Sequence, residues 1–356
     1  MTRPIQAVIQ LSALVNNLLV ARQAAPDSKI ISVIKANAYG HGLLHVAKAL
    51  EESDGFAVLS LQEAVRLREA GFTQRILLLE GVFTETEMVT VTEHCLSLVI
   101  HTYEQIAWLR HAWAAQRIDV FIKLNTGMHR LGFAPQELPQ VLSALQTCPI
   151  LGRVILMTHF ATADEGEGVR EQLAVFQELN RPHGLLASLA NSAAVLRYPE
   201  THADWVRPGI MLYGASPFND VSAAELGLEP VMTLRSAVIA VQQIKAGAHV
   251  GYGGTFTADA DMRIGVVACG YADGYPRHAA TGTPILVDGI RTRTLGRVSM
   301  DMLMIDLTPI PHVEIGAPVT LWGEGLSVEE VARAACTISY ELLCARAERV
   351  PLIVLN

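Results

Sequence analysis

Short apolar runs rich in β-branched residues alternate with amphipathic helical patterns from residue 1 to about 230. This alternation constrains the fold most, because parallel strands need long crossover connections and helices usually supply them. It predicts a closed barrel or a doubly wound sheet. Nine runs qualify as strands, one more than an eight-stranded barrel needs, so we expect one of them, with the first as the candidate, to lie elsewhere. They are AVIQL, KIISVIK, GFAVLS, RILLLE, LSLVI, DVFIKL, VILMTHF, LLASLAN and IMLYG.

The pattern changes near Glu229-Pro230, where strand-like runs follow one another without helices between them. Asp288-Gly289 lies between two such runs, as the type I′ turn of a β-hairpin would. Ser327 and Glu330 have the spacing of a capping box, which predicts one late helix. We therefore expect two domains: residues 1–229 form the α/β unit, and 230–356 form a mostly antiparallel β unit.

The overall composition excludes several classes of function. Hydrophobic residues make up 51% of the 356 residues, so the chain can bury a large core. A net charge of −8 without a dense Lys/Arg cluster predicts no nucleic-acid or membrane partner. The early run LSALVNNLLVARQAA is interrupted by Asn16 and Asn17 and has helical spacing. We read it as an amphipathic helix rather than a signal peptide, and expect a cytoplasmic protein.

The cysteines and histidines show no metal-ligand spacing, so we expect no metal. The cysteines are odd in number, scattered and never in a CxxC pattern, which argues against a disulfide framework. We expect all of them to be buried, inert thiols. They are Cys95, Cys148, Cys269, Cys336 and Cys344.

Polar side chains gather where the predicted strands of the first unit end. In a (β/α)8 barrel the active site forms at the C-terminal ends of the strands. A single lysine or histidine there is more often structural, but several at equivalent strand ends indicate a shared site. These residues are Lys35, Lys123, Arg130, His159, Asn191, Ser192 and Arg207, which precedes Gly209.

Lys35 has the most specific setting of this group. It follows the apolar run IISVI, where partial burial would lower its pKa and favour the neutral amine that forms an imine with a carbonyl. The next residues, AYGHG, add a phenol, an imidazole and exposed backbone N–H groups. Tyr39 lies four residues on, within reach of the same ligand if the turn is helical. For Lys35 taken alone, a surface lysine is the alternative.

The run VIKANAYGHG resembles the cofactor-lysine signature of the alanine racemases, fold-type III enzymes that use pyridoxal 5'-phosphate. Other runs resemble that family's further blocks in the same order, over essentially the whole chain. The resemblance implies an isomerase with a TIM (β/α)8 barrel joined to a β-domain, and a head-to-tail homodimer with shared active sites. It also implies that the first strand packs with the second domain. The further runs are KLNTGMHRLGF, MTHFATADE, NSAA, WVRPGIMLYG, VGYGGTF, CGYADGYPR and GRVSMDM.

The resemblance implies two bases on opposite faces of the substrate. Lys35 would hold the cofactor as a Schiff base and act on D-alanine, and Tyr252 of the other subunit would act on L-alanine. A phenol is a poor base at neutral pH unless its anion is stabilised. The resemblance implies that His159 and Arg207 give this help. Arg207 would also hydrogen-bond the pyridine nitrogen; because arginine keeps its proton, the ring is a weaker electron sink and transamination is suppressed.

The resemblance also implies how the cofactor phosphate and the substrate carboxylate are bound. The phosphate would meet the backbone N–H groups of Gly209 and Ile210 and the hydroxyls of Tyr39, Ser192 and Tyr340. Taken alone, Ser192 would be a helix N-cap, and Tyr340 and Tyr252 would be core residues.

The substrate carboxylate would meet Arg130, whose fork suits it, and the backbone N–H of Met300 from the second subunit. Lys123 matches a lysine that is carbamylated in the family and orients that arginine; an unmodified lysine is the alternative. Tyr271 and Asp301 would line the entrance and the dimer contact.

Four rival functions have specific arguments against them. A related decarboxylase needs no second base, so the VGYGGTF block disfavours it, and broad-specificity racemases are typically exported. A cofactor-carrying barrel without catalysis would not need the β-domain blocks that contain Tyr252 and Met300. An aldolase without cofactor would not need the phosphate-binding set. Supply of D-alanine for cell-wall peptidoglycan and catabolism of L-alanine both remain open as biological roles.

Overall fold

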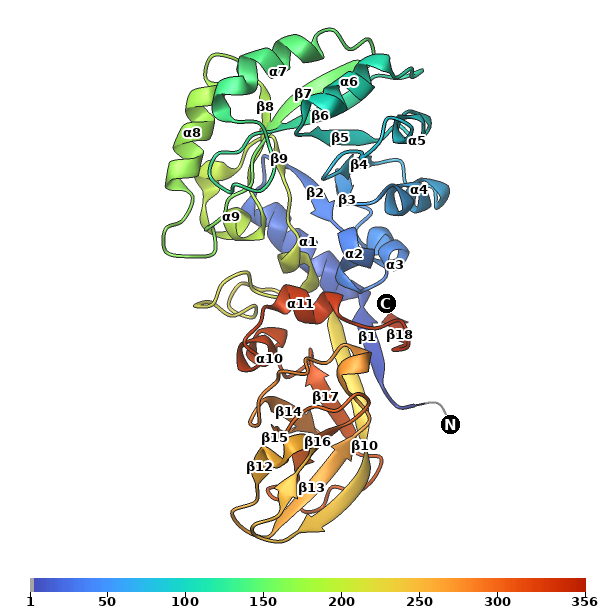
Figure 1. Cartoon of the computed structure of the whole chain (residues 1–356), viewed down its shortest axis with the longest axis vertical. Coiled ribbons are helices and arrows are strands. Elements are labelled where there is room, and N and C mark those ends of the chain that lie inside the picture. Colours follow the sequence, from blue (N-terminus) through green and yellow to red (C-terminus); the bar gives the residue numbers. More distant parts are fainter. Residues whose placement is uncertain (1–2) are drawn as a thin grey trace.

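The computed structural model describes residues 3–356, which form two lobes arranged end to end (Figure 1). In the first lobe eight parallel strands close into a barrel, because β2 pairs with both β3 and β9. The predicted TIM barrel is therefore confirmed. Its strands are β2 (Lys29–Val33), β3 (Gly55–Val58), β4 (Arg75–Leu78), β5 (Ser97–Ile100), β6 (Ile118–Lys123), β7 (Leu151–Met157), β8 (Leu186–Ser188) and β9 (Trp205–Val206).

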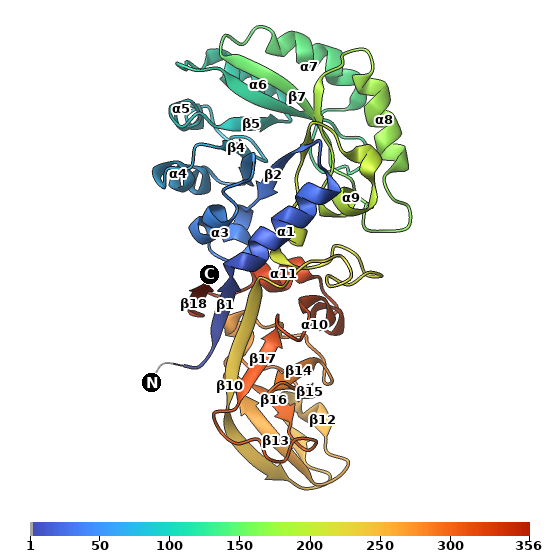
Figure 2. The same cartoon turned by 180° about the vertical axis from the view of Figure 1, so that it is seen from behind.

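Helices cover the outside of the barrel between successive strands (Figures 1 and 2). Their starts follow local sequence rules: Ser60 and Glu63 form a capping box at the start of α4, and Thr102 caps α6. The helices are α1 (Leu11–Ala24), α2 (Lys35–Tyr39), α3 (Leu43–Ala49), α4 (Leu61–Glu69), α5 (Glu87–Glu93), α6 (Tyr103–His111), α7 (Leu138–Leu145), α8 (Arg170–Asn180) and α9 (Ser192–Arg197), with 3-10 turns η1 (Pro135–Glu137) and η2 (Pro199–Thr201).

The second lobe is built on one long strand, β10 (Met232–Ile244). Its first half pairs with β1 (Gln6–Gln10) and β17, and its second half pairs with β13. A ring of six strands results, in the order β10, β13, β16, β15, β14 and β17. β1 lies between β10 and β18, next to β10 in Figure 2. The other elements are β11 (His249–Val250), β12 (Phe256–Thr257), β13 (Met262–Val267), β14 (Pro284–Val287), β15 (Ile290–Leu295), β16 (Leu303–Asp306), β17 (Pro318–Trp322), α10 (Val328–Ala334), α11 (Ser339–Cys344) and β18 (Leu352–Leu355).

The local predictions for this lobe have mixed outcomes. Asp288 and Gly289 both have positive φ between β14 and β15, as a type I′ hairpin turn requires, so that prediction is confirmed. The capping box is only half formed. Ser327 accepts from the backbone N–H of Glu330, but the Glu330 carboxylate pairs with Arg291 at 2.5 Å instead of turning back to the cap.

The prediction of a strand at IMLYG is wrong. Ile210–Tyr213 forms a 3-10 helix, η3, and the eighth barrel strand is the two-residue β9 just before Arg207. All four residues of η3 are buried, and a short apolar run has the same pattern in a strand and in a buried helix. Pro208 and Gly209 separate the run from β9 and end the strand.

The prediction that every cysteine is buried is also wrong. Cys148 and Cys269 are buried, whereas Cys95, Cys336 and Cys344 are exposed. Cys95 and Cys336 have positive φ just after helices α5 and α10, where the chain turns at the surface. Between residues 3 and 356, no helix is both long and apolar enough to cross a membrane.

Candidate active site

A cavity of about 460 Å³ opens at the C-terminal ends of the barrel strands. It brings together every site residue predicted on the barrel, together with Tyr340 from α11, a helix of the second lobe that contacts α2. Figure 1 shows α11 between the lobes, against the barrel. The predicted residues that line the cavity are Lys35, Tyr39, Lys123, Arg130, His159, Ser192, Arg207, Gly209, Ile210 and Tyr340.

The turn after Lys35 is helical, as the position of Tyr39 required, but it is left-handed. Ala36, Asn37, Ala38 and Tyr39 have φ values of 55°, 52°, 55° and 50°. A left-handed conformation costs a residue with a side chain about 1–2 kcal/mol, and four in succession are stable only if their surroundings hold them. Contacts from the rest of the fold must therefore stabilise this turn, which fixes the backbone directly after Lys35.

Side chains around the turn hold its backbone in place. Glu63 accepts a hydrogen bond from the Asn37 N–H at 2.9 Å, and the Asn37 side chain accepts one from the Leu43 N–H at 2.9 Å. The Nδ1 atom of His41 lies 3.0 Å from the Ala38 carbonyl and 2.8 Å from the Tyr39 carbonyl. Carbonyls only accept, so Nδ1 carries the proton. Burial lowers the pKa of His41 to about 4, which keeps the imidazole neutral.

Tyr39 belongs to a stack of rings at the base of the cavity. Its ring lies 4.5 Å from that of Tyr213 and 6.1 Å from that of Tyr340, and His41 packs on Tyr213 at 4.7 Å. Burial raises the pKa of both Tyr39 and Tyr340 above that of a free phenol. Both hydroxyls therefore keep their protons and can donate to an anion.

Ser192 and the backbone of Gly209 and Ile210 form a small donor group beside Tyr39. The Ser192 hydroxyl accepts from the Gly209 N–H at 2.8 Å, which leaves its own proton free for a ligand. Within residues 3–356 the Ile210 N–H has no hydrogen-bond partner. A Cβ on Gly209 would come within 2.8 Å of the Tyr39 hydroxyl. The helix cap predicted at Ser192 is instead Asn191, whose side chain accepts from the Ala194 N–H.

Arg207 is 4% exposed and lies directly after β9. Its Nη1 donates to Ser188 Oγ at 2.6 Å, and its Nη2 donates to the Thr158 and Leu189 carbonyls at 2.8 and 3.2 Å. All these partners are neutral, and in the described part of the chain Nε has no partner. Burial lowers the pKa of Arg207 to about 10, so the guanidinium stays charged at neutral pH, and within residues 3–356 its Nε–H and one Nη1 hydrogen remain unpaired.

The cavity is strongly cationic, and this shifts the groups inside it. Burial, reinforced by repulsion from Arg207 and Arg130, lowers the pKa of Lys123 to about 8. Burial and the same positive charges lower the pKa of His159 well below its usual value, so its imidazole is neutral. Such a site favours anions, namely a phosphate or a carboxylate.

Four predicted site residues lie outside this cavity, on the second lobe. Tyr252, between β11 and β12, is 71% exposed, and Met300 and Tyr271 are 53% and 38% exposed. Asp301 is bonded to Arg349 at 2.6 Å. One chain therefore does not bring these four residues to Lys35.

Some lining residues were not predicted. Glu80 lies two residues after β4, the position that Lys35 has after β2 and His159 has after β7. That shared offset would have identified Glu80 from the sequence. Cys344 also lines the cavity. It lies in the short helix α11, far from the barrel strands in sequence, and no motif in the sequence indicates its position there. No group of three or more His, Cys, Asp or Glu side chains in residues 3–356 is placed to bind a metal ion.

Comparison with known proteins agrees with this architecture. The family models for the alanine racemase N-terminal and C-terminal domains match residues 9–217 and 231–354. The chain is 56% identical to the alanine racemase of Nitrosomonas europaea over 98% of both chains, and 54% identical to that of Nitrosospira multiformis over 98% of this chain and 99% of the relative. The biosynthetic alanine racemase of Pseudomonas aeruginosa superimposes with a TM-score of 0.97, at 47% identity and full coverage of both chains. The chain belongs to the alanine racemase family.

Proposed function

We propose that this protein interconverts L-alanine and D-alanine with pyridoxal 5'-phosphate bound at Lys35. The proposal depends most on the cavity at the C-terminal ends of the barrel strands. There Lys35, next to the left-handed turn held by Glu63 and His41, shares the cavity with hydroxyl, N–H and guanidinium donors. Family membership supports the same activity, since its relatives are alanine racemases. Relatives of this kind are isomerases.

The residues present fit this cofactor. The hydroxyls of Tyr39, Ser192 and Tyr340, together with the free Ile210 N–H, suit a phosphate dianion. The absence of a Cβ at Gly209 leaves room for the Tyr39 hydroxyl to face that group. The unused Nε of Arg207 suits the pyridine nitrogen, which it can hydrogen-bond without transferring a proton. When bound, the cofactor withdraws electrons from the substrate Cα and so acidifies its proton.

Racemisation needs one group to remove the Cα proton and another to return a proton from the opposite face. Lys35 Nζ serves one face of the substrate. Tyr252 of a second copy serves the other, which its 71% exposure on the second lobe makes accessible. Neutral His159 can accept a hydrogen bond at one ring nitrogen and donate at the other, and so supports the Tyr252 oxygen. The proposal therefore includes a homodimer.

The substrate carboxylate would bind the Arg130 fork and the Met300 N–H of the second copy. Arg130 lines the cavity, and the Met300 N–H has no partner within residues 3–356. We include carbamylation of Lys123 in the proposal. A pKa of about 8 leaves part of its amine neutral and able to add carbon dioxide, and the carbamate would offset the charge of Arg130. Tyr271 and Asp301 would lie at the entrance.

We also propose a cytoplasmic location, because three exposed free thiols suit a reducing compartment. The substrate assignment is tested by measuring racemisation of alanine, serine, lysine and arginine side by side. Alanine should be turned over fastest, and a preference for lysine or arginine would contradict the assignment.

The site assignment is tested by borohydride reduction of the purified protein, followed by peptide mapping. The cofactor should become fixed to Lys35 and to no other lysine. Tyr252→Phe should keep cofactor binding but lose proton abstraction from L-alanine, measured as exchange of the Cα proton with deuterated solvent. Exchange from L-alanine at the wild-type rate would refute the two-base scheme.

A further inference from the structure

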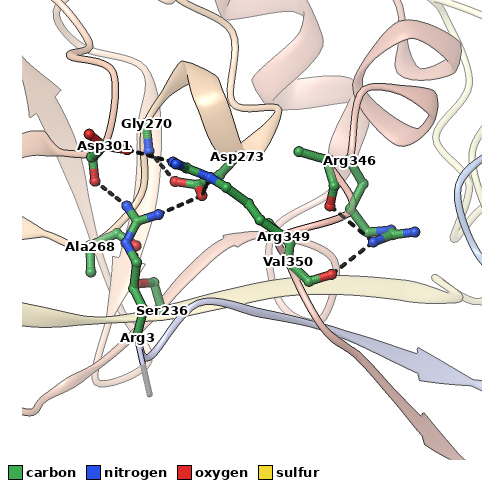
Figure 3. Close-up of polar contacts among 10 residues, drawn as sticks. Arg3, Ser236, Ala268, Gly270, Asp273, Asp301, Arg346, Arg349 and Val350 are labelled. Atoms are coloured by element: carbon green, nitrogen blue, oxygen red, sulfur yellow. Dashed lines mark hydrogen bonds and ion pairs between the residues drawn. The ribbon is translucent and has the colours of Figure 1, made fainter. Parts of the chain in front are cut away.

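Asp273 is a fully buried carboxylate in the second lobe, 0% exposed, with charged partners from both ends of the described chain. Its Oδ1 accepts from Arg3 Nη1 at 2.6 Å and from Arg349 Nε at 2.8 Å. Its Oδ2 accepts from the Gly270 N–H at 2.9 Å (Figure 3). Burial of a carboxylate is costly unless it is paired and fully hydrogen-bonded, and this one is both.

The same two arginines continue to Asp301. Arg349 Nη2 donates to Asp301 Oδ1 at 2.6 Å, and Arg3 Nη2 donates to the Asp301 backbone carbonyl (Figure 3). Two guanidinium groups thus connect two carboxylate residues. We call Arg3, Asp273, Asp301 and Arg349 the arginine clasp.

The clasp joins two loops that are also bonded backbone to backbone. Tyr271 N–H donates to the Ser299 carbonyl at 3.0 Å, and Ala272 N–H donates to the Met300 carbonyl at 2.9 Å. A Cβ on Gly270 would lie 2.3 Å from the Ser299 carbonyl oxygen, so no larger residue fits this contact. Residues 270–273 and 299–301 therefore form one unit. It exposes Tyr271 and Met300, and the Met300 N–H has no partner within residues 3–356.

The segment that carries Arg349 is itself tied to the turn at Lys35. Arg346 donates from Nε to the Gly40 carbonyl at 2.8 Å and from Nη1 to the Val350 carbonyl at 2.8 Å. The Ala347 N–H donates to the Asp273 carbonyl at 3.2 Å. Figure 3 shows Arg346 and Arg349 on this one stretch of chain. Through this segment the two-loop unit is connected to the turn that follows Lys35 in the same subunit.

We propose that Arg3 and Arg349 are positioning residues for the active site of the other subunit, because the clasp fixes the loops that deliver Tyr271 and the Met300 N–H to it. Neither arginine lines the cavity of its own chain. The inference rests on the proposed function, in which Met300 binds the substrate carboxylate across the dimer. A contact made equally in the ground state and the transition state affects KM and leaves kcat unchanged.

The test compares Arg349→Gln, Arg3→Gln and Arg349→Lys with the wild-type holoenzyme. Each Gln variant should raise KM for alanine by about three- to tenfold, with kcat within about twofold of wild type and the cofactor absorbance unchanged. Arg349→Lys keeps one charge against Asp273 but cannot bridge to Asp301, so its KM should be intermediate. Arg235→Gln is the matched control, since Arg235 pairs with Glu324 on the surface of the same lobe; its KM should not change.

The outcomes separate this inference from the proposed function. If the wild-type enzyme racemises alanine and all three clasp variants have wild-type KM values, the positioning role is overturned. The same holds if only the active fraction falls while KM stays constant, because that pattern indicates a purely structural role. If Arg349→Gln does not fold, Arg349→Lys and Arg3→Gln decide the matter. A wild-type protein without racemase activity removes both proposals.

Discussion

Lys123 is a basic residue in a cavity that also holds Lys35, Arg130, Arg207 and the neutral His159. Burial and repulsion from Arg207, Arg130 and Lys35 lower its pKa to about 8, because the protonated amine would be repelled by these positive charges. Conversion to a carbamate would remove a positive charge and add a negative one at the same position. The electrostatics of the cavity therefore support the proposed carbamylation of Lys123, in addition to the family resemblance.

This leads to a prediction for Lys123. Protein equilibrated with ¹³C-labelled bicarbonate near pH 8 should show a carbamate carbon signal by NMR, and Lys123→Met should lack it. Loss of the signal should be accompanied by a higher KM for alanine, because Arg130 is then no longer oriented. A wild-type spectrum without any carbamate signal would argue for an unmodified lysine.

The buried imidazole of His41 makes the stability of the protein depend on pH. Its folded pKa of about 4 lies below the ordinary 6.5, so its stabilising contribution is complete above pH 6.5 and is lost as the pH falls toward 4. His41→Leu should lower the free energy of unfolding at pH 7.5 by about 1–3 kcal/mol, because the Ala38 and Tyr39 carbonyls lose their donor.

Urea denaturation at several pH values checks this prediction. The difference between wild type and His41→Leu should shrink below pH 6.5, at up to about 1.4 kcal/mol per pH unit. His45→Leu, which replaces an exposed histidine in the same segment, should show no such trend. Parallel pH profiles for wild type and His41→Leu would rule out the neutral buried imidazole.

Among the elements, the left-handed turn and η3 together define the cofactor pocket. They approach so closely that a Cβ on Gly209 would lie 2.8 Å from the Tyr39 hydroxyl. Tyr39 belongs to the left-handed turn held by Glu63 and His41, so its side chain has little freedom to shift away from a Cβ at position 209. The shape of the pocket therefore requires that residue 209 has no Cβ.

We therefore expect Gly209→Ala to weaken cofactor binding by about tenfold, the effect of losing one hydrogen bond to a charged group. Equilibrium titration of the apoprotein with pyridoxal phosphate measures this. Gly166→Ala is the matched control, because a Cβ there meets nothing within 4 Å. Equal affinities in the two variants would mean that the Tyr39 hydroxyl does not contact the cofactor.

These elements also show how far the sequence could be read. Periodicity predicted parallel strands in a closed barrel or a doubly wound sheet, and the family resemblance selected the barrel. The predicted strand ends already grouped Lys35, Lys123 and His159 into one site. Periodicity failed at η3, because a run of four buried residues is too short to distinguish a helix from a strand. It also missed β11 and β12, which have two residues each. The left-handed turn was also unpredictable, because its stability comes from distant partners such as Glu63.

At the scale of the whole molecule, the proposed bases lie on different lobes of the chain. Lys35 is inside the barrel cavity, whereas Tyr252 is exposed on the β lobe. Family resemblance supplied the expectation of a shared site, and composition or periodicity could not have done so. The relation between the lobes depends on contacts of residues far apart in sequence, such as Arg346 with Gly40.

A complementation experiment tests the shared site directly. Lys35→Ala and Tyr252→Phe should each be inactive, but mixing them under conditions that exchange subunits should restore activity. Half of the resulting dimers are mixed and each has one intact site of two, so about a quarter of the wild-type activity is expected. Re-isolated homodimers of either variant serve as the control. Absence of recovery, with subunit exchange verified, would indicate sites contained in single chains.

The place of β1 has a consequence for synthesis. Its core residues Ala7, Val8 and Ile9 are buried only after β10 has been made, about 220 residues later. At about 5–20 residues per second, β1 waits roughly 11–44 s on the ribosome without its partner, while all eight barrel strands emerge. During that interval an apolar strand is available to any other unpaired edge. Slow translation should therefore favour aggregation of the nascent chain. Helix α1 follows β1 directly and packs on the barrel lobe, so it can limit the motion of β1 until β10 has been synthesised.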